Sequence, residues 1–476
     1  INEWPLRPSY GGGLSMDNIE QEVKHDVAVV IAPLHLQSHL RQFLQFACQI
    51  SSYGLPVYYL GLATSNHEAR TRSTALNPDD IAKIHFHDLQ VDDQHPPPDF
   101  PEHVWYASMR SREPIASFLR DISSKARRVV VIHDHLMAYN VMDISSIPNG
   151  ESYIFYCISI FDIFCSHYAA HAGLPIPLEE ELLNKLPSND GCYVLDDVDH
   201  HSKLLSQCMH INAGALYNTS QVIEGKAFID SMAHFESLQN KKLWAVGPIL
   251  PSQKDHKIQN QHLCLDWLDK QPPKSVLYVS FGTSTSFSPE QIKELAIGLE
   301  LSKQRFIWVL RNADKGDPVV NKCEENKTEV LELPEGFEEK VKGVGLVLRE
   351  WAPQQEILAH SSTGGFMSHC GWTSCLESIT AGVPIVAWPI QFDQPKNGFL
   401  LAEILKTGLL VRTWEKREEL VTASTIQNIV SKFMASEEGD MIRKRAQELY
   451  EAVRRSTEKG GISRMELESF VAHITR

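Results

Sequence analysis

Residues 351–394 read WAPQQEILAHSSTGGFMSHCGWTSCLESITAGVPIVAWPIQFDQ, and this stretch decides the fold class. An apolar run at 364–368 ends in a turn of small residues, a helical pattern follows, and a second apolar run occupies 384–387. Short continuous apolar runs are typical of parallel strands that are buried on both faces. The order strand, helix, strand therefore predicts one unit of a parallel α/β sheet.

The turn at 368–374 (SHCGWTS) joins the strand to the helix, and its residue types suit a phosphate. Its glycine lets the backbone approach an anion, while the free amides and positive dipole end of the helix attract negative charge. His369, Thr373 and Ser374 add side-chain donors. Glu377, one helical turn further on, can accept hydrogen bonds from the hydroxyl groups of a ribose.

Aromatic and polar residues at the two ends of the stretch complete a nucleotide-sugar pattern. Trp351 follows a strand candidate and offers a flat ring for stacking on a base. Asp393 and Gln394 place a carboxylate and an amide side by side, which suits sugar hydroxyls. Each feature alone occurs in many proteins that bind no nucleotide. Together, at fixed spacing in one strand-helix pattern, they predict a nucleotide-sugar site.

The same alternation of strands and helices occurs elsewhere in the chain. The first apolar run, 27–32, is followed by a loop and then by a helical pattern from Ser38. The run 275–280 repeats this form, since a turn of small residues follows it and Ser288-Pro289 marks a helix start. This alternation predicts two parallel-sheet domains, each covered by helices. Further strand candidates lie at 57–60, 128–133, 306–310 and 345–348.

The composition narrows the possible partners. Lysine and arginine number 45 against 60 aspartate and glutamate, a formal net charge of −15, so the chain has no global attraction to nucleic acid or anionic membranes. A mean hydropathy of −0.23 and the lack of a long uncharged apolar run argue against membrane insertion. The nine scattered cysteines show no zinc-type spacing, which favours a reducing, cytoplasmic location. The phosphate groups of any ligand must therefore be bound by nearby backbone amides and a few side-chain donors, because the net charge of the chain does not attract them.

At nearly every fixed position, 351–394 resembles the signature box of the plant family 1 UDP-glycosyltransferases, WxPQxxxLxHxxxGxFxxHCGWNSxxExxxxGVPxxxxPxxxDQ. CLDWLD at 264–269 and SVLYVSFGT at 275–283 resemble the opening of that family's second domain. The resemblance extends over 16–476. It implies the α/β GT-B architecture, in which two Rossmann-like parallel-sheet domains face a cleft and the last helix crosses back to the first domain.

The resemblance also implies a division of the chain. Residues 1–15 differ in character from the rest of the sequence, and Met16 is a natural initiator, so we interpret 1–15 as a vector-derived tail. The remaining parts are an acceptor-binding domain at 16–250, a linker at 251–262, a UDP-sugar-binding domain at 263–458, and a C-terminal helix at 459–476 that packs on the first domain.

Carried over residue by residue, the family pattern assigns the parts of the donor to the second domain. It implies that uracil is held by Trp351 and Ala352, ribose by Gln354 and Glu377, diphosphate by Thr283, Ser284, His369 and Ser374, and the sugar by Trp372, Asp393 and Gln394. Gln394 stands where the family associates Gln with glucose over galactose. One position departs from the pattern, because Thr373 replaces the usual Asn. A threonine hydroxyl can still donate one hydrogen bond, so we expect a retained but altered phosphate contact.

An inverting transfer needs a base that deprotonates the acceptor, and histidine suits this task because its pKa is near neutral. PLHLQSHL at 33–40 resembles the family's P-x-x-x-Q-G-H-x, which places the base at His39 and puts Ser38 where glycine is common. His39 is then expected at a helix N-terminus that faces the cleft. His35 falls on the preceding loop and is expected to line the acceptor pocket.

A catalytic histidine usually needs a carboxylate that orients it. Asp134 follows the strand candidate and matches the family's aspartate in VIHDSLM, here VIHDHLM at 131–137. The alternative role for Asp134 is a plain cap at the end of a strand. His135 replaces the usual serine, so it is expected as a second acceptor-pocket residue or a second acid-base group.

The resemblance implies an enzyme without a cofactor, in which UDP-glucose is a co-substrate. The family holds the diphosphate with helix amides and histidine in place of Mg²⁺, and no DxD motif stands in a strand context here. We therefore expect no metal. The expected partners are a UDP-sugar donor and a small lipophilic acceptor, and the expected state is a monomer.

HDHLMA at 133–138 and SIPNGESYIFYCIS at 146–159 resemble the zeatin O-glucosyltransferase-like branch of the family. The implied acceptor is a cytokinin, a phenolic or a flavonoid, and the predicted reaction is inverting transfer of glucose to one of its hydroxyls. Ser38 and His135 leave a second reaction open, in which an aromatic carbon of a flavonoid-type phenol attacks to give a C-glycoside.

Two functions from other classes compete with this prediction. A non-catalytic nucleotide-sugar binding protein is expected to lack His39 or Asp134, and both are present. A Rossmann oxidoreductase is expected to carry G-x-G-x-x-G after its first strand, whereas 33–38 reads PLHLQS. The site residues, and not the fold alone, therefore favour a transferase.

Overall fold

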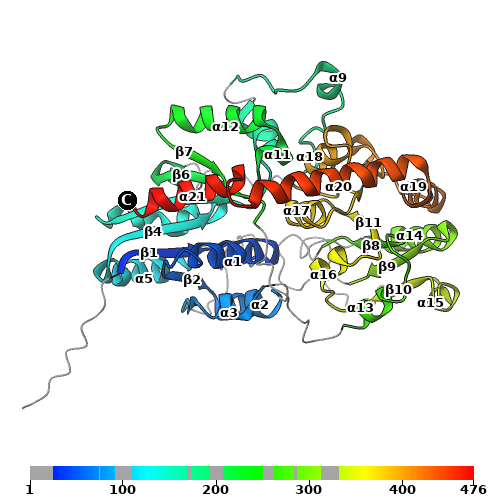
Figure 1. Cartoon of the computed structure of the whole chain (residues 1–476), viewed down its shortest axis with the longest axis horizontal. Coiled ribbons are helices and arrows are strands. Elements are labelled where there is room, and N and C mark those ends of the chain that lie inside the picture. Colours follow the sequence, from blue (N-terminus) through cyan, green and yellow to red (C-terminus); the bar gives the residue numbers. More distant parts are fainter. Residues whose placement is uncertain are drawn as a thin grey trace, which may run out of the picture.

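The structure is a computed structural model that describes residues 25–73, 76–91, 110–169, 173–192, 205, 207–249, 262–282, 287–311 and 332–476. Two parallel β-sheets, one in each half of the chain, form the framework (Figure 1). The predicted linker at 251–262 falls almost entirely on residues outside this described part, as does the predicted tail at 1–15.

The first sheet has seven strands in the order β3-β2-β1-β4-β5-β6-β7, and each neighbouring pair is parallel. The chain moves outward from β1 to β3 and then returns to the other side of β1 to form β4. The carboxyl ends of β1 and β4 therefore flank a switch point, the place where open α/β sheets bind ligands. The strands are β1 His25–Ala32, β2 Val57–Gly61, β3 Ile84–Asp88, β4 Ala126–Asp134, β5 Gly150–Tyr156, β6 Asn212–Tyr217 and β7 Lys242–Ala245.

The second sheet has six strands in the order β10-β9-β8-β11-β12-β13, again all parallel. Its chain path repeats that of the first sheet, so its switch point lies between β8 and β11. The strands are β8 Val276–Ser280, β9 Arg305–Val309, β10 Gly345–Leu348, β11 Thr363–Ser368, β12 Ile385–Ala387 and β13 Gly408–Leu410.

Helix α1 (Gln37–Ser51) packs its apolar residues on the first sheet, and it is buried over an unusually wide arc. Phe43 and Phe46 both lie against Phe155 of β5, with ring centroids 4.8 and 4.9 Å apart. Gln42 and Gln45 are buried as well, so the polar side of α1 is also covered. The other helical segments of this half are α2 Ala63–Thr71, α3 Pro78–Ile81, α5 Arg112–Lys125, η1 His135–Met137, α6 Ala138–Val141, η2 Met142–Ser146, α7 Ile160–Ile163, η3 Phe164–Tyr168, α9 Glu180–Leu183, η4 Met209–Ile211, α11 Gln221–Glu224 and α12 Lys226–Leu238.

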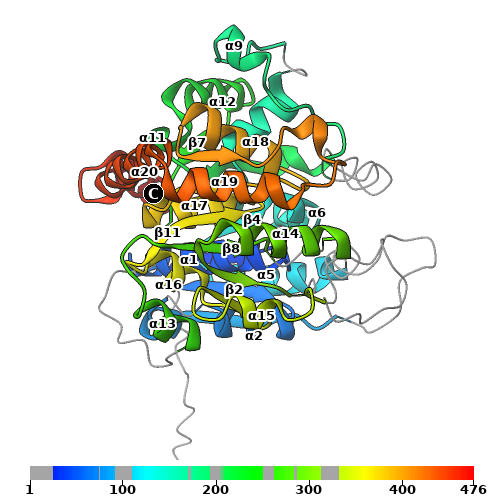
Figure 2. The same ribbon diagram turned by 90° about the vertical axis from the view of Figure 1, so that its right-hand side faces the viewer.

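The polar side of α1 contacts α17 of the second half, where Arg41 pairs with Glu377 and Gln42 donates to Thr373 (Figure 1). Figure 2 looks onto the second half of the chain. In the same half, Ser288 caps α14 by accepting a hydrogen bond from the backbone of Gln291 at 3.2 Å, as its Ser-Pro start predicts. The helical segments here are α13 Leu263–Leu268, α14 Pro289–Ser302, α15 Phe337–Lys340, α16 Gln354–Ala359, α17 Trp372–Ala381, α18 Gln394–Phe399, η5 Leu400–Ile404, η6 Trp414–Lys416, α19 Ala423–Ala435, α20 Glu437–Thr457 and α21 Ile462–Ile474.

The last helix returns to the first sheet, and Figure 1 shows α20 and α21 (red) crossing from one half to the other. Phe470 of α21 is fully buried against Tyr153 and Trp244, with ring centroids 5.3 and 5.2 Å away. Burial of one such ring contributes about 1.5–3 kcal/mol. The C-terminal helix is therefore an integral part of the first domain's core.

Among the described helices, none combines the length and the apolar composition that a membrane crossing needs. The cellular location of the protein stays a prediction.

Candidate functional site

The switch point of the first sheet brings together the predicted base and its predicted partner. His39 lies in the first turn of α1, directly after β1, and Asp134 is the last residue of β4. Nδ1 of His39 lies 2.6 Å from Oδ2 of Asp134. The carboxylate is completely buried, and the His39 side chain keeps 13 % of its surface exposed. The pair therefore combines a buried carboxylate with an imidazole that solvent or a substrate can reach.

Asp134 uses its two carboxylate oxygens for different tasks. Oδ2 holds His39, while Oδ1 accepts a hydrogen bond from the backbone of Leu136 at 2.9 Å and caps the short helix η1. The sequence left a partner of His39 and a plain cap as alternatives for Asp134, and in the structure its carboxylate makes both contacts. The cap fixes the rotamer of Asp134, so the position of the carboxylate is set before any substrate binds.

The electrostatics of this pair favour an ionised carboxylate and a basic imidazole. Burial acts to raise the pKa of Asp134, but the charges and hydrogen bonds of His39 and His135 outweigh it and hold this pKa well below its usual range. Burial acts to lower the pKa of His39, but the charge and hydrogen bond of Asp134 outweigh it, so this pKa is raised above 6.5. With Asp134 ionised, Nδ1 of His39 carries the proton and Nε2 is left as the acceptor.

Two further histidines lie on the chain segments that carry the pair, His35 before α1 and His135 directly after Asp134. His135 stacks on Tyr156, with ring centroids 5.2 Å apart, and its Nδ1 lies 3.2 Å from Oδ1 of Asp134. The ring nitrogens of His35 are buried and find no hydrogen-bond partner among the described residues, and burial lowers its pKa to about 4. His35 is therefore neutral at physiological pH, which suits an apolar wall better than an acid-base role.

Cys157 lies next to the pair. Of the residues that the structure describes, only His39, Asp134 and Cys157 gather metal-ligand atoms in one cluster, within 4.8 Å of one another. The 2.6 Å hydrogen bond already accounts for two members, and burial raises the pKa of the Cys157 thiol well above its usual range, so the thiol stays protonated. The cluster is thus a hydrogen-bonded pair with a neutral thiol beside it, and the expectation that no metal is needed stays a prediction.

At the switch point of the second sheet a histidine again faces a residue from the neighbouring strand end, but here the histidine is neutral. His369 follows β11 and faces Gly282, which follows β8; a Cβ at position 282 would lie 2.8 Å from the imidazole. A Cβ at position 371 would lie 2.7 Å from Nε2 of His369, so a side chain at either glycine would force the ring to move. Cys370 adopts a left-handed φ of 67° in this tight turn. Burial lowers the pKa of His369 to about 4, so the ring is a neutral hydrogen-bonding group.

The first turns of α17 carry a network of polar side chains. Gln354 donates to Glu377 at 2.6 Å and to Ser374 at 3.2 Å, which joins three residues predicted to contact ribose or diphosphate. Glu377 also pairs with Arg41 of α1, whose Nη1 lies 2.5 Å from Oε1. Arg41 was not predicted from the sequence, because a charged residue on a helix normally faces solvent and nothing local marks its partner in the other domain.

Trp372 and Thr373 also contact the first domain. The indole nitrogen of Trp372 donates to the backbone oxygen of Asn218 at 3.0 Å, and the ring is almost completely buried. Thr373 accepts a hydrogen bond from Gln42 of α1 at 2.8 Å. The sequence assigned residue 372 to the sugar and left residue 373 as an altered phosphate contact; in the structure both side chains touch acceptor-domain residues.

Asp393 and Gln394 stand at the start of α18. Oδ2 of Asp393 accepts from Asn397 at 2.8 Å, and burial together with the charge of Asp162 raises the pKa of Asp393 to about 7. Oε1 of Gln394 accepts from the backbone nitrogens of residues 390 and 391, at 2.9 and 3.0 Å. The amide nitrogen of Gln394 is then the group that remains to donate to a ligand.

The remaining residues predicted to bind the UDP-sugar fall into two groups, those that the structure describes and those that it does not. Trp351 is partly buried on the loop before α16, and Ala352 beside it is buried. Thr283 and Ser284 lie outside the described residues.

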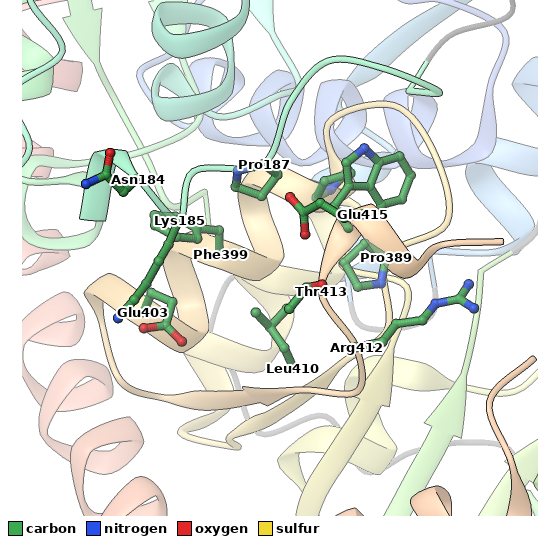
Figure 3. Close-up of a pocket in the computed structure, with 12 residues that line it drawn as sticks. Asn184, Lys185, Pro187, Pro389, Phe399, Glu403, Leu410, Arg412, Thr413 and Glu415 are labelled. Atoms are coloured by element: carbon green, nitrogen blue, oxygen red, sulfur yellow. The ribbon is translucent and has the colours of Figure 1, made fainter. Parts of the chain in front are cut away.

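A cavity of about 280 Å³ lies elsewhere on the molecule, between loop residues 184–187 of the first half and the segment that follows β12 (Figure 3). Its walls include Pro187, Phe399 and Trp414, with Lys185 and Arg412 at the polar edge. None of the predicted site residues lines it. The cavity is therefore separate from the two switch points.

Comparison with known proteins gives one consistent result. Residues 25–251 match the family model "Glycosyltransferase, N-terminal domain", and residues 248–453 match "UDP-glucoronosyl and UDP-glucosyl transferase". The chain is 45% identical over 460 residues to a zeatin O-xylosyltransferase of Phaseolus vulgaris, covering 94% of this chain and 98% of that protein. It is also 45% identical over 473 residues to a zeatin O-glucosyltransferase of Phaseolus lunatus, covering 97% and 100%.

A solved structure extends the likeness to three dimensions. The crystal structure of a ugt transferase from Siraitia grosvenorii in complex with UDP superposes with a TM-score of 0.75 at 27% sequence identity. The superposition covers 95% of this chain and 100% of that one. The likeness thus includes both sheets and their relative placement.

Proposed function

Because this chain belongs to the plant family 1 UDP-glycosyltransferases, we propose that it transfers glucose from UDP-glucose to a hydroxyl of a cytokinin-like acceptor. The family and the GT-B fold predicted from the signature box are confirmed, and the protein is a UDP-sugar-dependent glycosyltransferase of the EC 2.4.1 type. The observation that carries the proposal is the buried Asp134 paired with His39 at a switch point whose partner domain holds the donor signature.

The choice of acceptor rests on relatives of nearly full length. Two of them, at 45% identity, are named for transfer to the oxygen of zeatin, and a cis-zeatin O-glucosyltransferase of Zea mays is 38% identical over 96% of this chain. The sequence at 133–138 and 146–159 favours the same branch. These segments form the end of β4, η1 and β5 around the pair, so the likeness includes the region where an acceptor must approach His39.

The proposed reaction follows from the tautomer of His39. Nε2 takes the proton of the acceptor hydroxyl while its oxygen attacks the anomeric carbon from the side opposite UDP. The bond between the anomeric carbon and the diphosphate oxygen breaks, and UDP leaves with that electron pair. Asp134 stabilises the imidazolium that forms, as a buried carboxylate does for a catalytic histidine. The N-terminus of α17 and the neutral donor His369 would stabilise the charge on departing UDP.

The sugar is proposed to be glucose on the basis of Gln394. The two relatives at 45% identity are named for different sugars, xylose and glucose, so overall identity does not distinguish the donors. The Gln394 side chain is held by two backbone amides, which leaves its NH₂ group in a fixed direction for sugar hydroxyls.

The direct test is mass spectrometry of the purified protein incubated with a UDP-sugar and zeatin, followed by treatment of the product with acid and β-glucosidase. We expect one added hexose with UDP-glucose, and a product that β-glucosidase cleaves. A pentose added more rapidly from UDP-xylose would overturn the choice of glucose. A product that resists both treatments, obtained with a flavonoid, would establish the C-glycoside predicted as the alternative.

The proposal includes a monomeric enzyme, since the predicted site residues that the structure describes come from the two halves of one chain. Light scattering during size-exclusion chromatography should give a mass close to 53.8 kDa. A larger mass that persists on dilution would contradict it.

A further inference from the structure

Gln42 of α1 occupies an unusual place between the two domains. Its side chain is buried, with 1 % of its surface exposed. Nε2 donates to the backbone oxygen of Cys157 at 3.1 Å and to Oγ1 of Thr373 at 2.8 Å, while Oε1 accepts from Asn218 at 2.6 Å. Both amide hydrogens are therefore used, one in each domain. An amide with this many fixed partners has one orientation.

The position of Gln42 in α1 connects it to the base. It follows His39 by three residues, about one helical turn, so a shift of Gln42 along α1 moves the base with it. Thr373 in turn lies in the first turn of α17, next to the switch point that holds His369. The hydrogen bond between Gln42 and Thr373 thus joins the helix that carries the base to the helix that faces the diphosphate.

Two neighbouring contacts join the same parts of the two domains. Asn218 binds the side chain of Gln42 and also accepts, through its backbone oxygen, the indole hydrogen of Trp372. Arg41 pairs with Glu377 one turn further along α17. Two consecutive residues of α1 therefore meet two residues of α17 that lie one helical turn apart, and Gln42 is the most deeply buried member of this set.

We propose that Gln42 is a positioning residue for the transfer step, acting through the Thr373 hydroxyl, and that this hydrogen bond sets the placement of His39 relative to the donor. The inference rests on the proposed function, because it assumes that His39 acts on an acceptor that attacks the bound sugar. It also gives a role to Thr373, which replaces the asparagine of the signature box.

The proposal makes a distinct kinetic prediction. A misplaced base slows the chemical step without weakening the binding of UDP, because the nucleotide contacts belong to the second domain. Loss of a phosphate contact would instead raise the dissociation constant of UDP. The turnover number and the UDP affinity therefore separate a positioning role for residue 373 from a purely phosphate-binding one.

The experiment compares Thr373→Val, which keeps the shape and removes the hydroxyl, with Thr373→Ser, which keeps the hydroxyl. Thr380→Val is the matched control, because the Thr380 hydroxyl bonds to the backbone of its own helix α17. We expect Thr373→Val to lower kcat about tenfold or more while the dissociation constant of UDP changes less than about twofold. Thr373→Ser should retain most of the turnover, and Thr380→Val should match the wild type.

A double-mutant cycle with Gln42→Leu identifies the partner. If Gln42 and Thr373 act through their shared hydrogen bond, the double variant should turn over no more slowly than the slower single variant. Losses in kcat that multiply would overturn the proposal, and so would a Thr373→Val variant whose defect lies wholly in UDP affinity. If Gln42→Leu fails to fold, judged by its thermal transition, the comparison of Val with Ser at position 373 still decides.

The proposed function and this inference fail in different ways. An acceptor other than zeatin leaves the test intact, because every ratio is taken against the wild type with whichever acceptor it glycosylates. A wild-type protein that glycosylates no acceptor would overturn the proposed function and the inference built on it. An active wild type whose turnover is insensitive to Thr373→Val would overturn the inference alone.

Discussion

The two switch points of this molecule have the same layout and opposite electrostatics. In each sheet a histidine from one side of the switch point faces a residue from the other side. In the first sheet His39 faces the carboxylate of Asp134, and its pKa is raised above 6.5. In the second sheet His369 faces Gly282, and burial lowers its pKa to about 4. The topology brings two strand ends together in each sheet, and the residue opposite each histidine decides the direction in which the pKa of the ring is shifted.

The largest expected effect follows from removal of the proposed base. His39→Ala should lower kcat by at least about a hundredfold, the usual scale for a lost general base. UDP affinity should stay unchanged, since His39 belongs to the other switch point. Turnover at saturating substrates and isothermal titration with UDP check the two parts. His67→Ala, at an exposed position of α2, is the control, and near-normal turnover of His39→Ala would remove His39 from the role of base.

The next test changes the residue opposite His39. Asp134→Asn keeps an oxygen that can cap η1 but removes the charge that raises the pKa of His39. In the wild type the rate should fall as pH drops through this raised pKa, because His39 becomes protonated and cannot accept a proton. The variant should lose about tenfold to a hundredfold in kcat, and the acid limb of its pH-rate profile should move to lower pH. If the acid limb of the variant stays at the wild-type pH, a group other than His39 is responsible for it.

The matching test in the second sheet should leave the pH profile alone. His369→Ala should raise the dissociation constant of UDP about tenfold, the scale of one hydrogen bond to a charged group. Because burial lowers the pKa of His369 to about 4, its protonation should not affect UDP affinity between about pH 6 and pH 8. Titrations across that range check both statements. A shift of the acid limb of kcat in His369→Ala would break the proposed division of roles.

A smaller effect is expected at the sugar end of the donor site. Gln394→Ala should raise KM for UDP-glucose about fivefold while UDP affinity changes less than about twofold, since the amide is expected to contact the sugar and not the nucleotide. Gln391→Ala in the same loop is the control for local loosening, because residue 391 uses its backbone to bind Gln394. Equal losses for UDP-glucose and for UDP would mean that the sugar lies elsewhere.

The smallest expected effect concerns metals. Removal of divalent ions with a chelator should change turnover by less than about twofold, because helix amides and a neutral histidine are expected to hold the diphosphate at the second switch point. Assays with and without EDTA, after dialysis, check this. A loss of activity that Mg²⁺ restores would show that the donor site needs an ion.

The sequence predicted most of the framework because buried parallel strands have a strong local signal. The runs at 27–32 and 275–280 became β1 and β8, and the helix expected from Ser38 begins at Gln37. Five of the thirteen described strands were not predicted, namely β3, β5, β6, β7 and β13. β5 and β6 are largely buried, whereas β3 and β13 have a weak signal. β3 reads IHFHD and is half exposed at the edge of its sheet, and β13 has only three residues. Neither shows the continuous apolar run that marks a central strand.

The residues of the candidate site also divide into those that the sequence predicted and those that it did not. The signature box assigned a place to His369 and Glu377, and the loop after the first strand assigned one to His39. The two histidines follow strand ends that the topology fixes, and Glu377 lies in the helix after one of them. Gln42, Arg41 and Asn218 gave no such signal. Each has a partner in the other half of the chain, at sequence separations of up to 336 residues, so their role depends on how the domains meet. Local pattern carries no information on that placement.

The return of α21 to the first sheet has a practical consequence for recombination between relatives. The last helix supplies Phe470 to the core around Trp244, and Arg128 of β4 donates to the backbone oxygen of Ile474 at 3.1 Å. The first domain is therefore built from two separate pieces of sequence. A chimaera that borrows its sugar preference from another transferase needs two crossover points, one near the linker and one between α20 and α21. A single crossover would join a foreign tail to the native acceptor domain and leave its core mismatched.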